Sequence, residues 1–458
     1  MSTEVRRPLS PMERWYWICD QISPLNVIAR VRVAGAIPPE DLARAAGWLV
    51  REHPLLRVAV ADEPDGTAPR FVAAPQTDLG IRTVRPESPD PARWEREVDE
   101  VELATSLDWR NGPLARIVDV AHPDGTHDLI LTVSHVIADG TTALRLLQRL
   151  VELAADPPPA PPPSREALPS PEALLPRRVN GLPRPVHMAL AVLADGVLMG
   201  VARPRRLAPL TPVPPDRRQT RLVSRTLDPH RLRELVARCR QEGVTVHSAL
   251  TAAIAFAVAG VAIGRAGTVC VGAPVDFRAE LVPPVGPHDA GAYVATVPSY
   301  VRVAPTGPQD AAALWTAARG VSRDLRRRRR FRQHLALVSM LRRMSPPSVL
   351  RSASAVRMID RIGPGNVCLS NLGRFDFPDR IGAWDLTGAQ FVAGISISGS
   401  LVASVNTSHA ALHCNFTYID GVVTRERAGR IADEAVRTLL SSLDTGASGV
   451  SVGTGMRG

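Results

Sequence analysis

The first third of the chain shows both of the common hydrophobic periods. Apolar residues recur at helical spacing in PPEDLARAAGWLVRE, which predicts a helix that ends at His53, because the residue before a proline avoids the helical region. ARIVDVAHPDGTHDLILTVSHV predicts two strands joined by a turn around Gly125. The leucines of TTALRLLQRLVELAA then predict a further helix, for which Thr141 or Thr142 is the expected N-terminal cap.

The second half repeats these patterns. LVSRTLDPHRLRELVARCRQEGVTVHSALTAAIAFAVAG predicts a strand, a helix from about Asp228, a turn at Gly243 and a long buried helix. TVCVGAPVDFRAEL predicts a strand and an exposed turn, and the very basic RDLRRRRRFRQHLALVSMLRRM is compatible with a helix. GNVCLSNLGRF, FVAGISISGSLVASVNTS and ALHCNFTYIDGVV predict three more strand regions, the middle one long enough for a hairpin. A last helix is expected from Thr424 to about Leu443.

A proline-rich segment lies between the two halves of the chain. Residues 156–219 hold two proline-rich stretches around PVHMALAVLADGVLMGVA, which is too short and too acidic at its centre for a transmembrane helix. We expect a crossover helix that packs on the protein, with a peripheral membrane contact as the alternative. The predicted organisation is a lobe at 1–155, the crossover, a second lobe at 220–445 and a tail at 446–458, with an α+β fold class.

Composition also narrows the function. The chain has 458 residues, of which 45% are hydrophobic and 22% charged, as expected of a large folded protein with more than one lobe. The net charge is +10, but every basic residue other than histidine is arginine and only 4% of residues are aromatic, so no nucleic-acid binding is expected. The five scattered cysteines predict free thiols in a reducing cytoplasm, with neither disulfides nor a metal site. No secretory leader is expected.

The stretch SHVIADG, from Ser134 to Gly140, is the strongest candidate for chemistry. A strand carries His135 to the rim of a sheet and a helix begins at Gly140, so the imidazole is expected to be rigid, partly desolvated and close to neutral in pKa. A Ser-His-Asp triad is excluded, because adjacent strand residues face opposite sides and the chain has no GxSxG elbow. Alone, the stretch is equally compatible with a general base and with a buried structural histidine.

Six segments resemble motifs of the CoA-dependent acyltransferase superfamily and occur along the chain in the order that the family has. The superfamily includes condensation domains, chloramphenicol acetyltransferase and the polyketide-associated (Pap-type) acyltransferases. SHVIADG resembles its HHxxxDG signature, PLSPMERWYW its opening motif and REHPLLR its His-Pro-x-Leu-Arg helix end. GVTVHSALTAAIAFAV is similar to its second-lobe helix, PVDFR to its Pro-Val-Asp-Leu-Arg, and SNLGRFD to its Ser-Asn-x-Gly strand. The resemblance spans nearly the whole chain and is closest to the Pap-type enzymes, which are similar to phthiocerol/phthiodiolone dimycocerosyl transferase.

The resemblance implies two chloramphenicol-acetyltransferase-like lobes that form a V-shaped pseudo-dimer with a central tunnel. It implies that His135 is the catalytic base and that Asp139 is a structural aspartate paired with an arginine, for which Arg278 is the expected partner. Ser370 and Asn371 match the second-lobe strand near the active site, where a hydroxyl or amide could steady an oxyanion.

Gly140 matches the turn glycine of the signature, but Ser134 stands where the family usually has its first histidine. Strand alternation should turn the Ser134 side chain away from the face of His135, so the base is expected to be retained, with a shifted acceptor specificity or a degenerate member as the open alternatives. The arginine run at 326–330 is expected to be a solvated helix face, with contact to CoA phosphates or an acidic carrier protein as the alternative.

The expected function is that of an O-acyltransferase of lipid or polyketide biosynthesis. It would move an acyl group from a CoA or carrier-protein thioester to the hydroxyl of a small molecule or lipid, as a cytoplasmic monomer with no resident cofactor. An amide-forming or cyclising condensation-type enzyme is one alternative. A catalytically silent module that binds carrier protein is the other.

Overall fold

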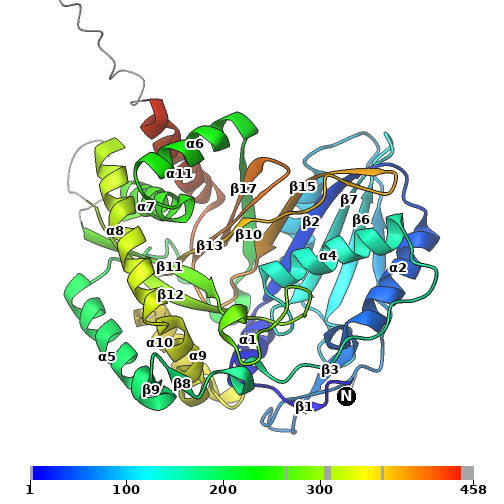
Figure 1. Ribbon diagram of the computed structural model, residues 1–458, viewed down its shortest axis with the longest axis horizontal. Helices are drawn as coiled ribbons and strands as arrows, with labels where there is room; N and C mark the ends of the chain where they lie inside the picture. The colour runs from blue at the N-terminus through cyan, green and yellow to red at the C-terminus, as the bar shows by residue number, and fades with distance from the viewer. Residues whose placement is uncertain (1–3, 264–266, 304–310, 363–365, 445–458) are drawn as a thin grey trace, which may run out of the picture.

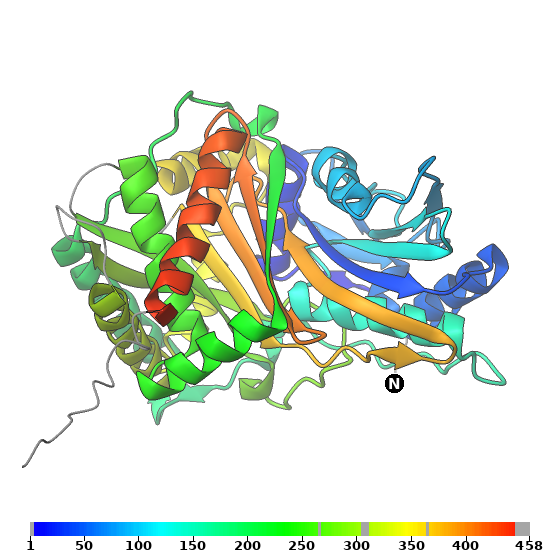
Figure 2. The ribbon, with the colours of Figure 1, turned by 90° about the horizontal axis from the view of Figure 1, so that it is seen from above.

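The computed structural model describes residues 4–263, 267–303, 311–362 and 366–444, and the predicted tail at 446–458 lies outside them. Two lobes, each a β-sheet covered by helices, lie side by side (Figures 1 and 2). The predicted α+β class with two lobes is thereby confirmed.

The N-terminal lobe is built on a six-stranded sheet in the order β14-β15-β2-β7-β6-β5. Its strands are β2 (Asn26–Ala34), β5 (Ile81–Val84), β6 (Ala115–Ala121), β7 (Thr126–Ser134), β14 (Arg380–Ile381) and β15 (Trp384–Ala393). Helix α4 (Gly140–Ala155) packs on this sheet and α2 (Pro39–Glu52) packs on α4 (Figure 1). The opposite face meets Trp94 of α3 (Arg93–Glu97) and Val98 of the short π-helix that follows it. Strand β7 is therefore covered on both faces, and its centre, Leu129 to Leu131, is a run of apolar residues.

Two smaller elements complete this half of the chain. A three-stranded sheet joins β1 (Arg7–Pro8), β4 (Arg70–Ala73) and β3 (Val58–Ala61). Helix α1 (Pro11–Ile22) begins with a capping box, in which the Ser10 hydroxyl accepts from the Glu13 N–H and the Glu13 carboxylate accepts from the Ser10 N–H. This cap fixes where α1 begins, and α1 reaches the space between the lobes.

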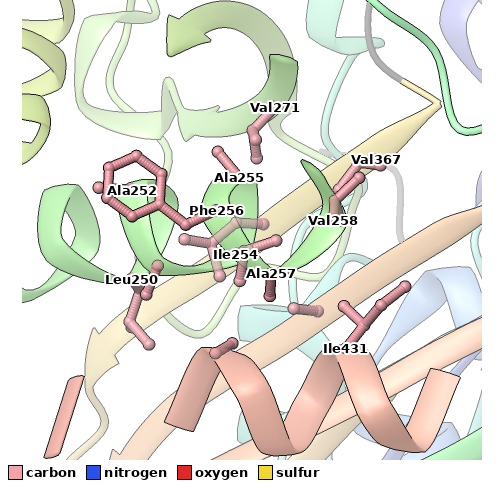
Figure 3. Close-up of a cluster of buried hydrophobic side chains, with 14 of the residues drawn as sticks. Leu250, Ala252, Ile254, Ala255, Phe256, Ala257, Val258, Val271, Val367 and Ile431 are labelled. Carbon is pink, nitrogen blue, oxygen red and sulfur yellow. The ribbon is translucent and has the colours of Figure 1, made fainter. Parts of the chain in front are cut away.

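The C-terminal lobe has a second six-stranded sheet in the order β10-β17-β16-β13-β11-β12. The strands are β10 (Thr220–Leu227), β11 (Gly267–Asp276), β12 (Val294–Val303), β13 (Val367–Arg374), β16 (Leu401–Ser408) and β17 (Ala411–Ile419). The helices are α6 (Pro229–Gln241), α7 (Val246–Val258), α8 (Ala311–Arg330), α9 (Gln333–Met344), α10 (Ala353–Ile362) and α11 (Arg425–Asp444). Helix α7 is mostly apolar and is buried from Ser248 to Val258, and Figure 3 shows its side chains between Val271 and Val367 of the sheet and Ile431 of α11.

The prediction of a hairpin in FVAGISISGSLVASVNTS is wrong in one respect. The segment does contain two strands, but β15 pairs with β2 in the N-terminal lobe, whereas β16 pairs with β13 and β17 in the C-terminal lobe (Figure 2). A period of two identifies a strand but not its partner. The segment predicted as the second lobe, 220–445, therefore completes the sheet of the first lobe.

The basic segment that was predicted to be compatible with one helix forms two. Helix α8 ends at Arg330 and α9 begins at Gln333, because Arg332 has the left-handed φ of 48°. The arginine run is also not wholly a solvated face: Arg328 is fully buried and pairs with Asp324 and Asp195.

The crossover contains helix α5 (Arg184–Ala202), preceded by the short hairpin of β8 (Arg178–Val179) and β9 (Leu182–Pro183). Helix α5 packs along α9 at the edge of the C-terminal lobe (Figure 1). It is the one helix within the described ranges that is by itself long and apolar enough to cross a membrane, judged by length and composition, and most of it is exposed.

Gly140, the first residue of α4, offers a test of how tightly β15 is packed into the N-terminal lobe. A Cβ at this position would lie 2.7 Å from two ring atoms of the buried Phe391 on β15. Gly140→Ala should therefore lower the free energy of unfolding by about 1–3 kcal/mol in chemical denaturation.

Gly47→Ala is the matched control, since Gly47 lies exposed within α2 and a Cβ there meets nothing within 4 Å. It should stabilise the protein by about 0.5–1 kcal/mol. Equal effects of the two substitutions would contradict the close approach of Phe391.

Candidate active site

His135 lies directly after β7, with its ring on the wall of a cavity between the two lobes. Its backbone N–H donates to the carbonyl of Leu25, 3.1 Å away. Its imidazole stacks on the Tyr16 ring of α1, with the ring centroids 4.2 Å apart and the planes 12° from parallel. Nδ1 is buried and has no hydrogen-bond partner among the described residues, and His135 belongs to the cavity lining, so Nε2 is the candidate nitrogen for contact with a substrate.

The environment of His135 favours a neutral imidazole. Burial lowers the pKa of His135 below its ordinary value of 6.5, and the charge of Asp139 and the carbonyl groups of His135 and Ala138 only oppose this effect. A neutral imidazole can accept a proton at physiological pH. The ring is therefore held in position and in the protonation state that a general base needs.

Asp139 caps α4 and is buried. Its carboxylate accepts hydrogen bonds from the backbone N–H groups of Thr142 and Tyr293, each 2.9 Å away, and from the Arg278 guanidinium at 2.8 Å. The expectation that Thr141 or Thr142 caps the helix is thus wrong, because the aspartate one turn earlier already accepts from the Thr142 N–H.

Arg278 follows β11 in the C-terminal lobe, so its contact with Asp139 crosses the lobe interface. The guanidinium also donates to the Thr142 hydroxyl at 2.8 Å and to Asp276 at 2.7 Å. Burial would raise the pKa of Asp139, but the Arg278 charge and the N–H donors outweigh it and hold that pKa below its usual range. Asp139 is therefore an ionised structural group.

The cavity has a volume of about 990 Å³ and is lined from both lobes, from α1 and from the crossover. The lining of α9 and α10 is mainly apolar: Leu337, Val338, Met340, Leu341, Met344, Ala355, Met358 and Ile359. Methionine and leucine walls adapt to flexible aliphatic groups. The part of the cavity lined by α9 and α10 is therefore suited to a hydrocarbon chain.

Another part of the lining is polar. Arg206, Asn366, Ser398 and Ser400 line it, together with an ion pair in which both nitrogens of Arg218 reach Asp360 at 2.9 and 3.0 Å. Within the described ranges, no cluster of three or more His, Cys, Asp or Glu side chains could hold a metal ion.

The remaining predicted residues separate into two groups. Ser370 lies on β13 and lines the same cavity as His135. Asn371 and Ser134 are outside the lining defined by the described residues: the Asn371 amide oxygen accepts from the Gly373 N–H at 2.8 Å, and the buried Ser134 hydroxyl accepts from the Val136 N–H at 3.3 Å. Both of these side chains bond locally to backbone.

Sequence reasoning missed two parts of the site. Tyr16 lies in PMERWYW, whose only sequence signal is a resemblance to a family motif. Its position in the sequence does not predict a contact with His135. Burial raises the pKa of Tyr16, so its hydroxyl stays protonated. The second part is the methionine-rich lining of α9 and α10, which was obscured because the basic residues dominate that segment.

Comparison with known proteins places this site in a family context. Residues 216–419 match the family described as phthiocerol/phthiodiolone dimycocerosyl transferase C-terminus. A protein of Mycobacterium tuberculosis assigned as a diacylglycerol O-acyltransferase is 33% identical over 121 residues, which are 25% of this chain and 24% of that protein. The matched segment thus spans about a quarter of the length of that relative.

Solved structures extend the likeness to the whole fold. The trichothecene 15-O-acetyltransferase of Fusarium sporotrichioides has a TM-score of 0.73 at 15% identity, with 95% of each chain covered. Polyketide synthase associated protein 5 of Mycobacterium tuberculosis has a TM-score of 0.64 at 17% identity, covering 96% of this chain and 99% of that one.

The fold is therefore that of the condensation-domain and chloramphenicol-acetyltransferase-like proteins, and the resemblance to the CoA-dependent acyltransferase superfamily is confirmed. Within that class, the sequence match of residues 216–419 is to the Pap-type transferases, as predicted, and the Mycobacterium tuberculosis relative and the Fusarium structure both bear acyltransferase names.

Removal of the Asp139 carboxylate tests whether the lobes depend on this ion pair. Asp139→Ala leaves the Arg278 guanidinium with one ionic partner in a buried site, so the free energy of unfolding should fall by about 3–5 kcal/mol. Arg437→Ala, which breaks the exposed pair with Glu434, is the control and should cost less than about 1 kcal/mol. Equal melting temperatures for Asp139→Ala and the wild type would show that the pair is not structural.

Proposed function

We propose that the protein is an O-acyltransferase in lipid or polyketide biosynthesis, with His135 as its general base. The observation that carries this proposal is an imidazole that stacks on Tyr16 and lines a large cavity between the lobes, where burial lowers its pKa. Its nearest acidic side chain in the motif, Asp139, is already used in structural contacts, so the imidazole acts without a triad.

In the proposed reaction, Nε2 of His135 takes the proton of an acceptor hydroxyl as its oxygen attacks the thioester carbonyl carbon. The tetrahedral intermediate then collapses, the carbon–sulfur bond breaks, and the thiolate leaves with a proton returned by the imidazolium. The products are an ester and a free thiol, and no covalent acyl-enzyme forms. Tyr16 positions the imidazole through the stacked contact.

Ser370 is the candidate for contact with the oxyanion. It lines the cavity that contains His135, and a hydroxyl donor directed at the developing charge would stabilise the intermediate. We do not assign Asn371 a role in oxyanion contact, because Asn371 is outside the cavity lining and its amide oxygen accepts from the Gly373 N–H of its own turn.

The donor is proposed to be a CoA or carrier-protein thioester with an aliphatic acyl group, and the acceptor a small-molecule or lipid alcohol. The apolar lining of α9 and α10 is the reason for proposing an aliphatic acyl chain. The arginine-containing part of the lining can contact polar groups of the donor or the acceptor. A cytoplasmic location is part of the same proposal.

An assay of thiol release from the acyl thioester distinguishes the two alternative functions from the proposed one. An amide-forming or cyclising enzyme would discharge the thioester to an amine instead of an alcohol. A silent carrier-binding module would bind acyl-loaded carrier protein without releasing thiol to any acceptor. The neutral and accessible His135 favours a catalytic protein over the silent module.

His135→Ala tests the base. It should lower kcat for alcohol-dependent thiol release from palmitoyl-CoA or palmitoyl-carrier protein by about 10²–10⁴-fold. Circular dichroism and melting should stay close to wild type, since the hydrogen bonds of Asp139 that hold the loop are left intact by this substitution. His230→Ala, on the exposed surface of α6, is the control and should leave kcat unchanged. Undiminished turnover in His135→Ala would remove the base assignment.

The pH dependence provides a second test. The base works when deprotonated, so kcat/KM should fall as pH falls through the pKa of His135 in the folded protein. Because burial lowers this pKa, the midpoint of the acid limb should lie below pH 6.5. A limb centred above pH 6.5, or an unchanged limb in the residual activity of His135→Ala, would assign the titration to another group.

A further inference from the structure

Helix α5 presents an outward face without a single polar side chain. The exposed fraction reaches 66% at Leu193 and 73% at Val201. The exposed positions of the helix are Pro185, Val186, Ala189, Leu190, Val192, Leu193, Ala194, Gly196, Val197, Gly200 and Val201. Water-facing helix surfaces normally carry polar side chains, so a continuous apolar face of this length indicates an interaction site.

The helix is anchored to the protein by its inward face. The His187 imidazole donates to the carbonyl of Phe331 at 2.6 Å, and Asp195 pairs with the fully buried Arg328. Asp195 is the one acidic residue between Glu172 and Asp216. Because this acid is engaged inside the protein, α5 is held flat against the lobe and is not free to cross a bilayer.

Arginines flank both ends of α5. Arg177 and Arg178 precede it and Arg203 and Arg205 follow it, and all four are exposed. None of the four has an acidic partner among the described residues. The exposed Phe331 adjoins the helix through the His187 contact. The surface therefore combines an apolar centre with positive charge at its two ends.

We propose that the outward face of α5 lies in the surface of a membrane that contains anionic lipids. Its leucines and valines would reach the acyl chains while the flanking arginines contact phosphate headgroups, because long arginine side chains can extend from an apolar surface to the polar boundary. The net charge of +10 adds attraction to such a surface.

Two other partners fit these features less well. Two copies of the chain packed through α5 would bring unpaired arginines of one copy near those of the other, with Asp195 engaged inside. An acidic carrier protein needs cations along the contact, whereas the centre of the α5 face has none. A lipid surface matches both the apolar centre and the basic ends.

The same surface leads toward the cavity. Helix α9 packs against α5 and also lines the cavity, and Figure 1 shows α5, α9 and α10 together on one side of the C-terminal lobe. Met344 and Met358, at 41% and 37% exposed, belong to the cavity lining. If the proposed function holds, a membrane-bound lipid alcohol would have a short route to His135; the membrane contact itself does not depend on that function.

The experiment is co-sedimentation of the full chain with phosphatidylcholine vesicles, with and without phosphatidylglycerol. We expect binding to the anionic vesicles that weakens as salt is added. Leu193→Gln/Val197→Gln should reduce the partition coefficient by about tenfold or more, because two apolar side chains no longer leave water. Val282→Gln is the control: Val282 is 64% exposed but lies outside α5, and its substitution should not change binding.

Arg177→Gln/Arg203→Gln should weaken binding to the anionic vesicles and leave any binding to phosphatidylcholine alone unchanged. His135→Ala should bind as the wild type does, so a failure of the acyltransferase proposal would not affect this result. The membrane proposal is overturned if the wild type binds neither vesicle or if the Leu193→Gln/Val197→Gln variant binds fully. A dimer in sedimentation velocity that this double variant dissolves, without vesicle binding, would assign the face to a second copy.

Discussion

The ion pair between Asp139 and Arg278 is the contact on which the arrangement of the site depends. It joins the first turn of α4 in the N-terminal lobe to the end of β11 in the C-terminal lobe, and both side chains are buried. An isolated buried charge is costly, but here the carboxylate accepts two backbone N–H groups besides the guanidinium, and the guanidinium has further oxygen partners. Because Asp139 is four residues from His135, the bonds that join the lobes also fix the short loop that carries the imidazole.

A second constraint holds the imidazole in place. The Tyr16 ring supports one face of His135, and burial in the protein favours the neutral form. At the other end of the loop, the lack of a side chain at Gly140 lets Phe391 of β15 pack directly over the start of α4. With the Asp139–Arg278 pair, the contacts to the motif come from α1, from β15 and from the end of β11. The site is therefore complete only when the chain has folded as a whole, which explains why a motif of seven residues alone could not distinguish a base from a structural histidine.

Much of this arrangement could be predicted from sequence, and the parts that could not have a common physical reason. The helix of residues 39–52, the strand pair before His135 and the buried α7 follow from local period and turn residues. The Asp139–Arg278 contact followed from the family resemblance. The partner of β15, the burial of Arg328 and the stacking of Tyr16 depend on contacts between distant segments. Periodicity records which side of an element is apolar and gives no information on which element covers it.

The departure at Ser134 can now be interpreted in terms of structure. The side chain is buried, lies outside the cavity lining and accepts a hydrogen bond from the Val136 N–H, so its contact supports the turn. A residue in that position affects the loop geometry, whereas the shape of the cavity is set by walls distant in sequence, among them α1, the crossover, α9 and α10. Helix α9 has one side on that cavity and the other on α5. The cavity wall and the exposed apolar surface are therefore joined through a single helix, and a change in how α9 packs would alter both.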